Sequence, residues 1–188
     1  MTLYLLRHEK RYSDPTYFTS LTDEGISNSK TLIEKIKDVR PDIIFSSPFL
    51  RCVQTAYPYV SEANKKLNIE YSLYEFLEDH AFTKENYAHT HSELYEAHPE
   101  FISIINEQYC SHIQMTDIHY PERTFEQLNN RLLPFINYLF KTYHDTSITI
   151  LIVAHQSIVS SIRHYLTTGR LAEKDYEFPM GHLEKIIL

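Results

Sequence analysis

Residues Leu3–Arg11 read LYLLRHEKR, a short apolar run that ends at an Arg-His pair and is followed by a further arginine. The apolar run, Leu3–Leu6, predicts a buried β-strand at the start of the chain. Beyond it, His8 stands between Arg7 and Arg11. A guanidinium group presents a planar set of donors that matches phosphate oxygens, and an imidazole can act as a nucleophile. The stretch therefore indicates a strand that carries a histidine to a phosphate site.

The composition limits the class of protein. The chain has 188 residues, 43% of them hydrophobic, and a net charge of −7, which predicts a soluble globular protein. Its acidic balance argues against binding to nucleic acid or to an acidic membrane, so any anion site must be built locally. With only 3 glycines, the chain lacks a glycine-rich nucleotide loop. Two cysteines, no apolar run long enough to span a membrane and no signal pattern predict a cytoplasmic location.

Apolar runs typical of strands alternate with helical patterns along the chain. We expect strands at Leu3–Leu6, Asp42–Phe45, Ile69–Leu73 (at an edge), Ser147–Ala154 and Ile186–Leu188. We expect helices between Thr22 and Pro41, from Phe49 to about Leu67 after a start at Ser47-Pro48, from about Phe125 to Tyr143, and from Ser157 to Leu166. This alternation predicts an α/β fold of three layers, α/β/α, with a mostly parallel central sheet. Residues 1–188 are expected to form a single domain, in which segment 76–120 is an excursion that covers the active site.

Three polar side chains follow three predicted strands. His8 comes after the first strand, Arg51 after the second, and His155 after the long strand Ser147–Ala154. Ligands of open parallel sheets bind beyond the carboxyl ends of the strands, so these side chains should meet there. Arg51 also lies near the start of a predicted helix, where backbone N–H groups favour an anion. The three residues together indicate an anion site.

Four motifs appear in the order found in a known family. They are RHEKR (Arg7–Arg11), SSPFLRCVQTA (Ser46–Ala56), SLYEF (Ser72–Phe76) and VAHQS (Val153–Ser157). With them the chain resembles the histidine phosphatase superfamily, in its phosphoglycerate-mutase-like branch 1. It looks most like the phosphatases with an Arg-His-Gly-Glu-Arg signature, such as the ecdysteroid-phosphate phosphatases and the catalytic domains of the suppressor-of-T-cell-receptor-signalling proteins. The resemblance implies a phosphoglycerate-mutase-like fold.

The resemblance also implies roles for individual residues. His8 would be the nucleophile that becomes phosphohistidine, and Glu75 would be the general acid that then acts as a base. His155 would be a further catalytic group. The substrate phosphate would be held by four side chains, Arg7, Arg11, Arg51 and His155. The family's chemistry needs no cofactor, and we expect no metal, because the histidines between residues 80 and 119 lack the spacing of metal ligands.

Two residues depart from the family's pattern. Glu9 and Gln156 each follow a site histidine where glycine is common.

We predict a histidine acid-type phosphatase, that is, a phosphomonoester hydrolase acting on a phosphorylated small molecule or a phosphopeptide. A phosphoglycerate mutase-type phosphotransferase and a non-catalytic phospholigand-binding module remain alternatives. The physiological substrate and the oligomeric state stay open.

Overall fold

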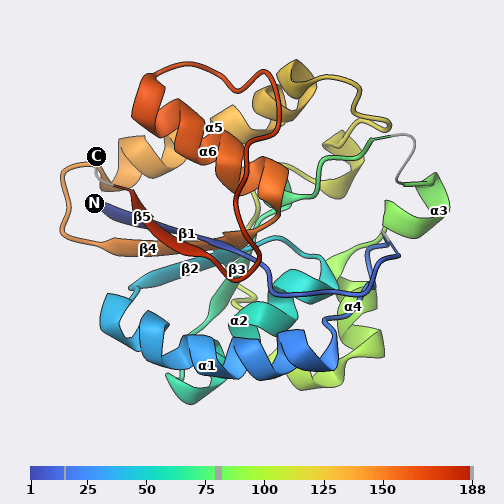
Figure 1. Ribbon diagram of the computed structural model, residues 1–188, viewed down its shortest axis with the longest axis vertical. Helices are drawn as coiled ribbons and strands as arrows, with labels where there is room; N and C mark the ends of the chain where they lie inside the picture. The colour runs from blue at the N-terminus through green and yellow to red at the C-terminus, as the bar shows by residue number, and fades with distance from the viewer. Residues whose placement is uncertain (15, 79–81, 187–188) are drawn as a thin grey trace.

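A mostly parallel sheet forms the centre of the computed structural model (Figure 1). In the described part of the chain, residues 1–14, 16–78 and 82–186, the sheet has five strands in the order β3-β2-β4-β1-β5. Their bounds are Thr2–Arg7 (β1), Ile43–Ser46 (β2), Leu67–Ile69 (β3), Thr149–Ala154 (β4) and Leu183–Ile186 (β5). Only β5 runs antiparallel, against β1. The predicted α/β/α fold is confirmed.

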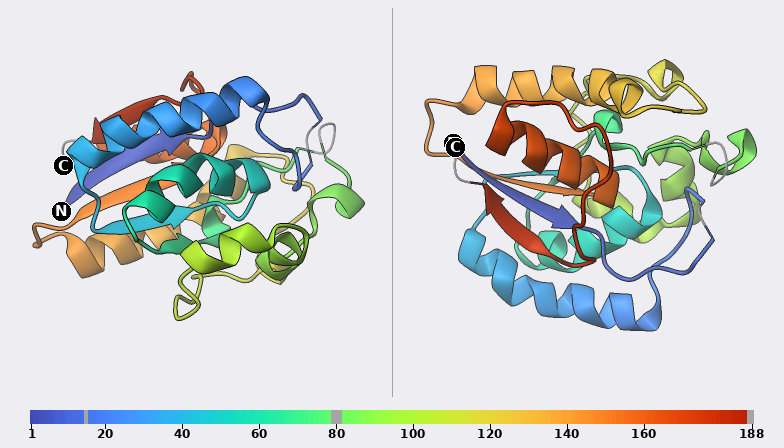
Figure 2. Two further views of the ribbon diagram at one scale, coloured as in Figure 1. Left: turned by 90° about the horizontal axis from the view of Figure 1, so that it is seen from below. Right: turned by 45° about the horizontal axis from the view of Figure 1, so that its top comes forward.

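Helices cover both faces of this sheet (Figure 2). On one face lie α1 (Asp23–Val39) and α2 (Leu50–Glu62), and on the other α5 (Phe125–Tyr143) and α6 (Gln156–Thr168). Thr22, where the first helix is expected to begin, caps α1, since its side chain accepts a hydrogen bond from the backbone of Gly25. The bounds of α5 also agree with those predicted. No helix in the described residues is both long and apolar enough to cross a membrane.

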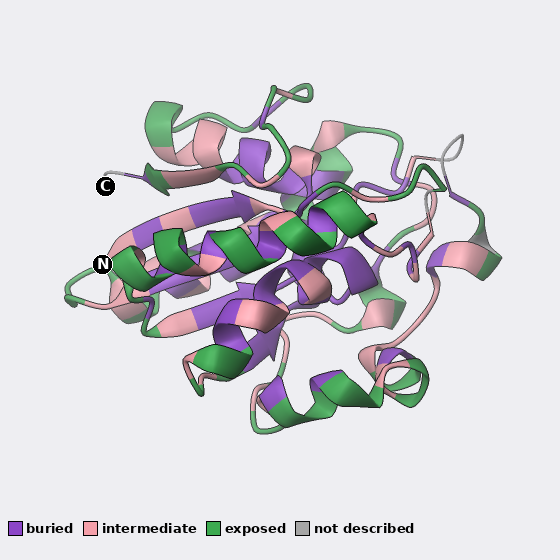
Figure 3. Cartoon of the chain, turned by 60° about the horizontal axis from the view of Figure 1, so that its bottom comes forward, coloured by how far each residue is buried: buried purple, intermediate pink, exposed green. Residues whose placement is uncertain are grey.

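The core is divided by the sheet into two clusters. Successive side chains of a strand point to opposite faces, so Leu5 packs with α5 and α6 while Leu6 packs with α1 and α2. In β4, Ile152 and Val153 alternate in the same way. The central strands are therefore largely buried, whereas α1 keeps an exposed outer face (Figure 3). A sheet buried on both sides gives a rigid base for the loops at its edge.

The segment after β3 consists of short helices. They are η1 (Tyr71–Leu73), α3 (Lys84–Tyr87), α4 (His91–Ala97), η2 (Pro99–Ile104) and η3 (Met115–Asp117). Leu94, Phe101 and Ile104 belong to the same core cluster as α2. Within this segment η2 packs against α2, and α4 packs against η2.

Both predicted ends of the second helix are wrong. The helix predicted from Ser47-Pro48 begins at Leu50, because Phe49 is still extended and Ser47 instead bonds a histidine described below. It ends at Glu62 and not at Leu67, because Asn64 adopts a left-handed conformation that turns the chain toward β3.

The edge strand predicted at Ile69–Leu73 is shorter than expected. It ends at Ile69, and the Glu70 side chain accepts a bond from the Ser72 amide, which caps a 3₁₀ turn. The last strand, predicted at Ile186–Leu188, lies at Leu183–Ile186, and residues 187–188 fall outside the described ones.

Candidate active site

The carboxyl ends of β1, β2 and β4 lie side by side. In the register of the sheet, Arg7 pairs with Ala154, and Ser46 pairs with Val153. The next residues after β1 and β4 are His8 and His155, whose ring centroids are 5.4 Å apart. The predicted convergence of the two histidines follows from this register.

His8 is a buried, neutral imidazole with a defined tautomer. Its Nδ1 lies 2.7 Å from the backbone oxygen of Glu9, which can only accept, so Nδ1 carries the proton. The lone pair of the neutral ring is therefore on Nε2. Burial, and next the charge of Arg51, holds the pKa of His8 well below its ordinary value. The ring is thus unprotonated, as a nucleophile must be.

Glu75 joins His155 to the helix that carries Arg51. Its Oε2 lies 3.3 Å from Nη2 of Arg51 and 3.2 Å from Nδ1 of His155. Burial alone would raise the pKa of Glu75, but the contacts with His155 and Arg51 hold it well below its usual range. Glu75 is therefore a carboxylate in this state of the site.

His155 has the same tautomer as His8. Because ionised Glu75 only accepts, Nδ1 of His155 carries the proton, and Nε2 accepts from the Ser47 hydroxyl at 2.8 Å. Burial lowers the pKa of His155 to about 4 even though Glu75 opposes this. Ser47, which the sequence suggested as a helix cap, is a positioning group for His155.

Arg51 lies at the bottom of the site and is fully buried. Its guanidinium donates to the backbone oxygen of Thr16 at 3.0 Å and lies 4.5 Å from the centroid of the Phe49 ring. Its Nε is a buried donor with no hydrogen-bond partner among the described residues, and the same is true of Nε of Arg7. Buried donors without acceptors are rare, and two of them here fit an anion.

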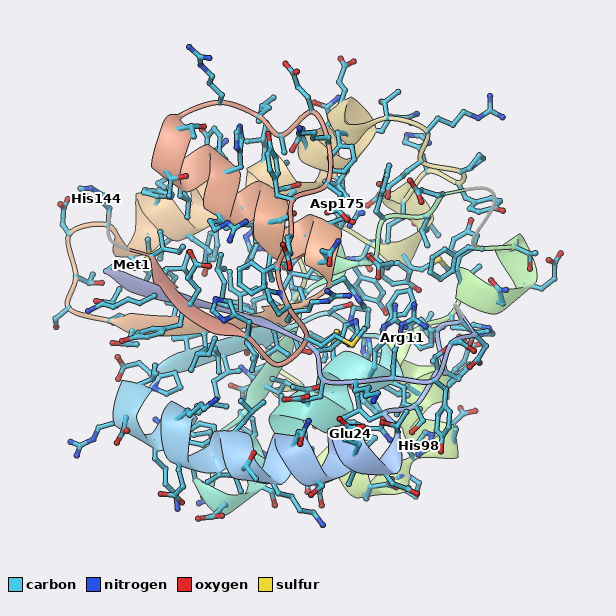
Figure 4. The ribbon with its side chains drawn as sticks, viewed as in Figure 1. Met1, Arg11, Glu24, His98, His144 and Asp175 are labelled. Carbon is cyan, nitrogen blue, oxygen red and sulfur yellow. The ribbon has the colours of Figure 1, made fainter. Side chains whose placement is uncertain are left out.

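Arg7 and Arg11 lie at a cavity beside Glu75. Both line a cavity of about 230 Å³ together with Glu75. The other lining residues are Phe76, Glu78, Phe82, Phe125, Gln156, Ser157 and Asp175. Figure 4 labels Arg11 and Asp175, which border the region beyond the carboxyl end of β1. All six predicted site residues are therefore brought together, four in direct contact and two at the cavity.

Gln156, one of the two departures from the family pattern, supports Arg7. Its Oε1 accepts from Nη1 of Arg7 at 2.5 Å, and its Nε2 donates to Asp175 at 2.6 Å. The backbone oxygen of Phe178 accepts from the same Arg7 nitrogen at 2.8 Å. The loop between α6 and β5 thus orients a predicted phosphate ligand. Asp175 was missed in the sequence, because no local pattern links it to the motifs.

Glu9, the other departure, packs against the same loop. It is buried, and its Oε1 would lie 2.0 Å from a Cβ added at Gly181. The Gly181 amide donates to the backbone oxygens of Arg7 and His8, at 3.1 and 3.2 Å. A side chain at Glu9 is therefore accommodated by the absence of one at Gly181. Asn28 donates to the Glu9 carboxylate at 3.3 Å.

A buried ion pair holds the backbone of the catalytic candidate Glu75. Nε of Arg131 lies 2.8 Å from Oε1 of Glu122. The same guanidinium donates to the backbone oxygens of Tyr74 and Glu75, at 3.0 and 3.3 Å. Arg131 and Glu122 therefore act at a distance from the cavity, by fixing the turn that carries Glu75.

The charges at the site favour an anion over a metal ion. Ligand atoms of His8, Glu75 and His155 lie within 4.8 Å of one another, and this is the one such group among the described residues. Arg51 already pairs with Glu75, and Arg7 lies at the same cavity. Two guanidinium groups next to the three side chains would repel a cation. The donor set therefore fits a metal ion poorly and a phosphate well.

Comparisons with known proteins concern the fold and the family of the chain. A search of curated proteins found no significant match. Among solved structures, ecdysone phosphate phosphatase from Bombix mori, in complex with tungstate, is similar with a TM-score of 0.67 and 16% identity, over 98% of this chain and 88% of that one. Alpha-ribazole phosphatase from Shigella flexneri gives a TM-score of 0.59 and 25% identity, over 89% and 80%.

A mycobacterial glucosyl-3-phosphoglycerate phosphatase, complexed with VO3, gives a TM-score of 0.67 and 16% identity, over 98% of this chain and 91% of that one. The family model of the histidine phosphatase superfamily, branch 1, matches residues 3–186. The match covers all four motifs and every residue of the site. The chain therefore belongs to branch 1 of the histidine phosphatase superfamily.

Proposed function

We propose that this protein is a phosphomonoester hydrolase that works through a phosphohistidine on His8. The observation that supports this most directly is the state of the His8 ring. Its Nδ1 proton is engaged by the Glu9 carbonyl, and its pKa is lowered, so the Nε2 lone pair is available for attack at neutral pH. Membership of a phosphatase superfamily supports the general reaction.

The phosphoryl group would bind where Glu75 now meets Arg51 and His155. An anionic oxygen already lies there, 3.3 and 3.2 Å from the two donors. The buried Nε donors of Arg7 and Arg51 would gain acceptors from a phosphate. Arg11, at the rim of the same cavity, would add a third guanidinium. Fixed cations of this kind stabilise the charge on a transferring phosphoryl group.

The chemistry would then proceed in two steps. Nε2 of His8 attacks phosphorus, the bond from phosphorus to the alcohol oxygen breaks, and Glu75 gives its proton to that oxygen. A water molecule next loses a proton to Glu75 and attacks the phosphohistidine, which releases phosphate and restores the neutral ring.

Glu75 must hold a proton in the first step, although its contacts with His155 and Arg51 favour the ionised form. Binding of a dianionic phosphate would remove its contacts with Arg51 and His155 and place negative charge beside it. Both changes raise the pKa of a carboxyl group. Substrate binding would therefore prepare the acid.

The substrates would be phosphorylated small molecules or phosphopeptides. The structural neighbours are named for small phosphorylated compounds, which supports the first class. Residues 1–188 would act as a single cytoplasmic phosphatase domain. In it, the start of segment 76–120, with Phe76 and Phe82 at the cavity, would border the substrate.

The test is to trap the phosphoenzyme. Protein mixed with a ³²P-labelled monoester and quenched in alkali should carry acid-labile label on His8, and His8→Asn should carry none. His98→Asn, which replaces a histidine outside the cavity, is the matched control and should label like the unmodified protein. Label on another residue, or full turnover by His8→Asn, would contradict the mechanism. Transfer to glycerate in preference to water would instead identify a phosphotransferase.

A further inference from the structure

We propose that the site selects phosphomonoesters whose alcohol carries no carboxylate and no second phosphate, and that Asp175 enforces this selection. The inference rests on the proposed phosphatase function and adds the substrate class to it. It follows from the charges and the shape of the cavity at Glu75. The carbon face of the alcohol would pack on Phe82 and Phe125.

The cavity has few cationic side chains. Among the described residues that line it, only Arg7 and Arg11 are arginine or lysine. Both lie next to the position proposed for the phosphoryl group, with Arg51 below. A second anionic group on the substrate would therefore find no further cation among these residues.

Asp175 adds a carboxylate to the lining of the same cavity. Its Oδ2 accepts from Gln156 at 2.6 Å, and its Oδ1 accepts from the Ser160 hydroxyl at 3.2 Å. These two bonds hold the carboxylate at the cavity even though the residue is exposed. A carboxylate on the substrate would lie in the same cavity as Asp175, and like charges repel there.

Three phenylalanines, Phe76, Phe82 and Phe125, form an apolar wall of the cavity. Phe76 and Phe82 are almost fully buried, and Phe125 packs against Phe76 with a centroid distance of 5.0 Å. All three residues line the cavity. Such a wall binds the carbon face of an alcohol and removes water from it, which makes a charged group at this position still less favourable.

The cavity size sets how much of the alcohol is enclosed. At about 230 Å³ it lies below the range usual for sites that enclose a whole ligand. It would hold the phosphoryl group and the first few atoms of the alcohol. Selection by Asp175 therefore applies to groups close to the ester oxygen, such as a carboxylate two carbons away.

A pair of substrates of nearly equal size tests the inference. Glycerol 3-phosphate and 3-phosphoglycerate differ in a hydroxymethyl group against a carboxylate. We expect the unmodified protein to favour the first at least tenfold in kcat/KM. Asp175→Asn should reduce this ratio about fivefold or more. The asparagine oxygen can still accept from Gln156, and its amide can donate to the Ser160 oxygen, so both bonds are kept.

The ratio is measured within each protein, so any common loss of activity cancels. Glu173→Gln makes the same change of charge on the same loop, but at an exposed residue that does not line the cavity, and should leave the ratio unaltered. Equal use of both substrates, or a ratio that Asp175→Asn does not change, overturns the inference while the phosphatase function stands. Failure to hydrolyse any monoester overturns the proposed function and the inference together.

Discussion

Glu75 is the side chain whose state must change most during the proposed reaction. In the structure it is an ionised partner of Arg51 and His155. As general acid it must instead carry a proton and face the leaving oxygen. The rate acceleration that Glu75 provides as an acid therefore depends on the pKa of the alcohol that it protonates.

Replacing Glu75 by glutamine should lower kcat by about 10² to 10⁴ for esters of alkyl alcohols, because these leave poorly without a proton. The loss should be much smaller for p-nitrophenyl phosphate, whose phenolate leaves readily. The measurement is kcat for both esters with the two proteins. Equal losses would contradict a role in protonating the leaving group and would indicate a purely structural effect.

Gln156 and Glu9 show how a residue unusual for the family is accommodated. Each occupies a position where glycine is common, and each has its partner on the loop between α6 and β5, namely Asp175 or Gly181. The sequence marked both positions as departures. Their partners lie 19 and 172 residues further along the chain, where no local pattern points to them.

Among the elements, the connection from α6 to β5 has a larger part than its irregular structure suggests. Phe178 and Gly181 bond the Arg7 side chain and the backbone of His8 from above, and β5 pairs with β1. The strand that precedes the proposed nucleophile His8 is therefore held by β4 on one side and by β5 with its loop on the other. Loosening this loop should disturb both stability and activity.

Gly181→Ala should destabilise the protein by about 1–3 kcal/mol. Its φ is +66°, and the added Cβ would meet the Glu9 carboxylate. Glu9→Ala should remove the clash but not the cost of the backbone angle, so the double variant should recover part of the loss. Urea denaturation of the two single variants and the double variant measures this coupling. Strictly additive effects would show that the two residues do not interact.

For the protein as a whole, the two buried histidines make stability depend on pH. The pKa of His155 is about 4 in the folded protein, against an ordinary value of 6.5, and that of His8 is also lowered. Between these values the unfolded chain binds more protons than the folded one. The contribution of the two histidines to the free energy of unfolding is therefore fully present above pH 6.5 and is lost as the pH is lowered toward 4.

We expect the free energy of unfolding to fall by a few kcal/mol between pH 7 and pH 5, since each unit of difference in pKa is worth about 1.4 kcal/mol. His155→Asn should show a weaker fall, because one of the two groups is gone. His98→Asn, at a partly exposed position, should follow the unmodified protein. Urea denaturation at a series of pH values gives the three slopes. Identical slopes for all three proteins would show that His155 does not contribute to the pH dependence of stability.

Much of this architecture could be predicted from neighbouring residues. The apolar runs identified β1, β2 and β4, the Thr22 cap identified the start of α1, and the 3.6-residue pattern gave the bounds of α5. These features depend on local backbone preference and periodicity, which a short stretch contains in full. The motifs, placed after strands, also predicted which side chains meet.

Other features depend on contacts between distant residues. The proximity of His8 to His155 and the bond of Ser47 to His155 depend on the register of β1, β2 and β4. The contacts of Glu75 with Arg51 and His155 depend on the path of the chain after β3. The early end of β3 depends on Glu70, whose carboxylate is held by Ser111 and His112 far along the chain. The strand-end histidine in LYLLRHEKR could thus be recognised from sequence, but its charge state and the shape of its pocket are set by groups that only folding brings within hydrogen-bonding distance.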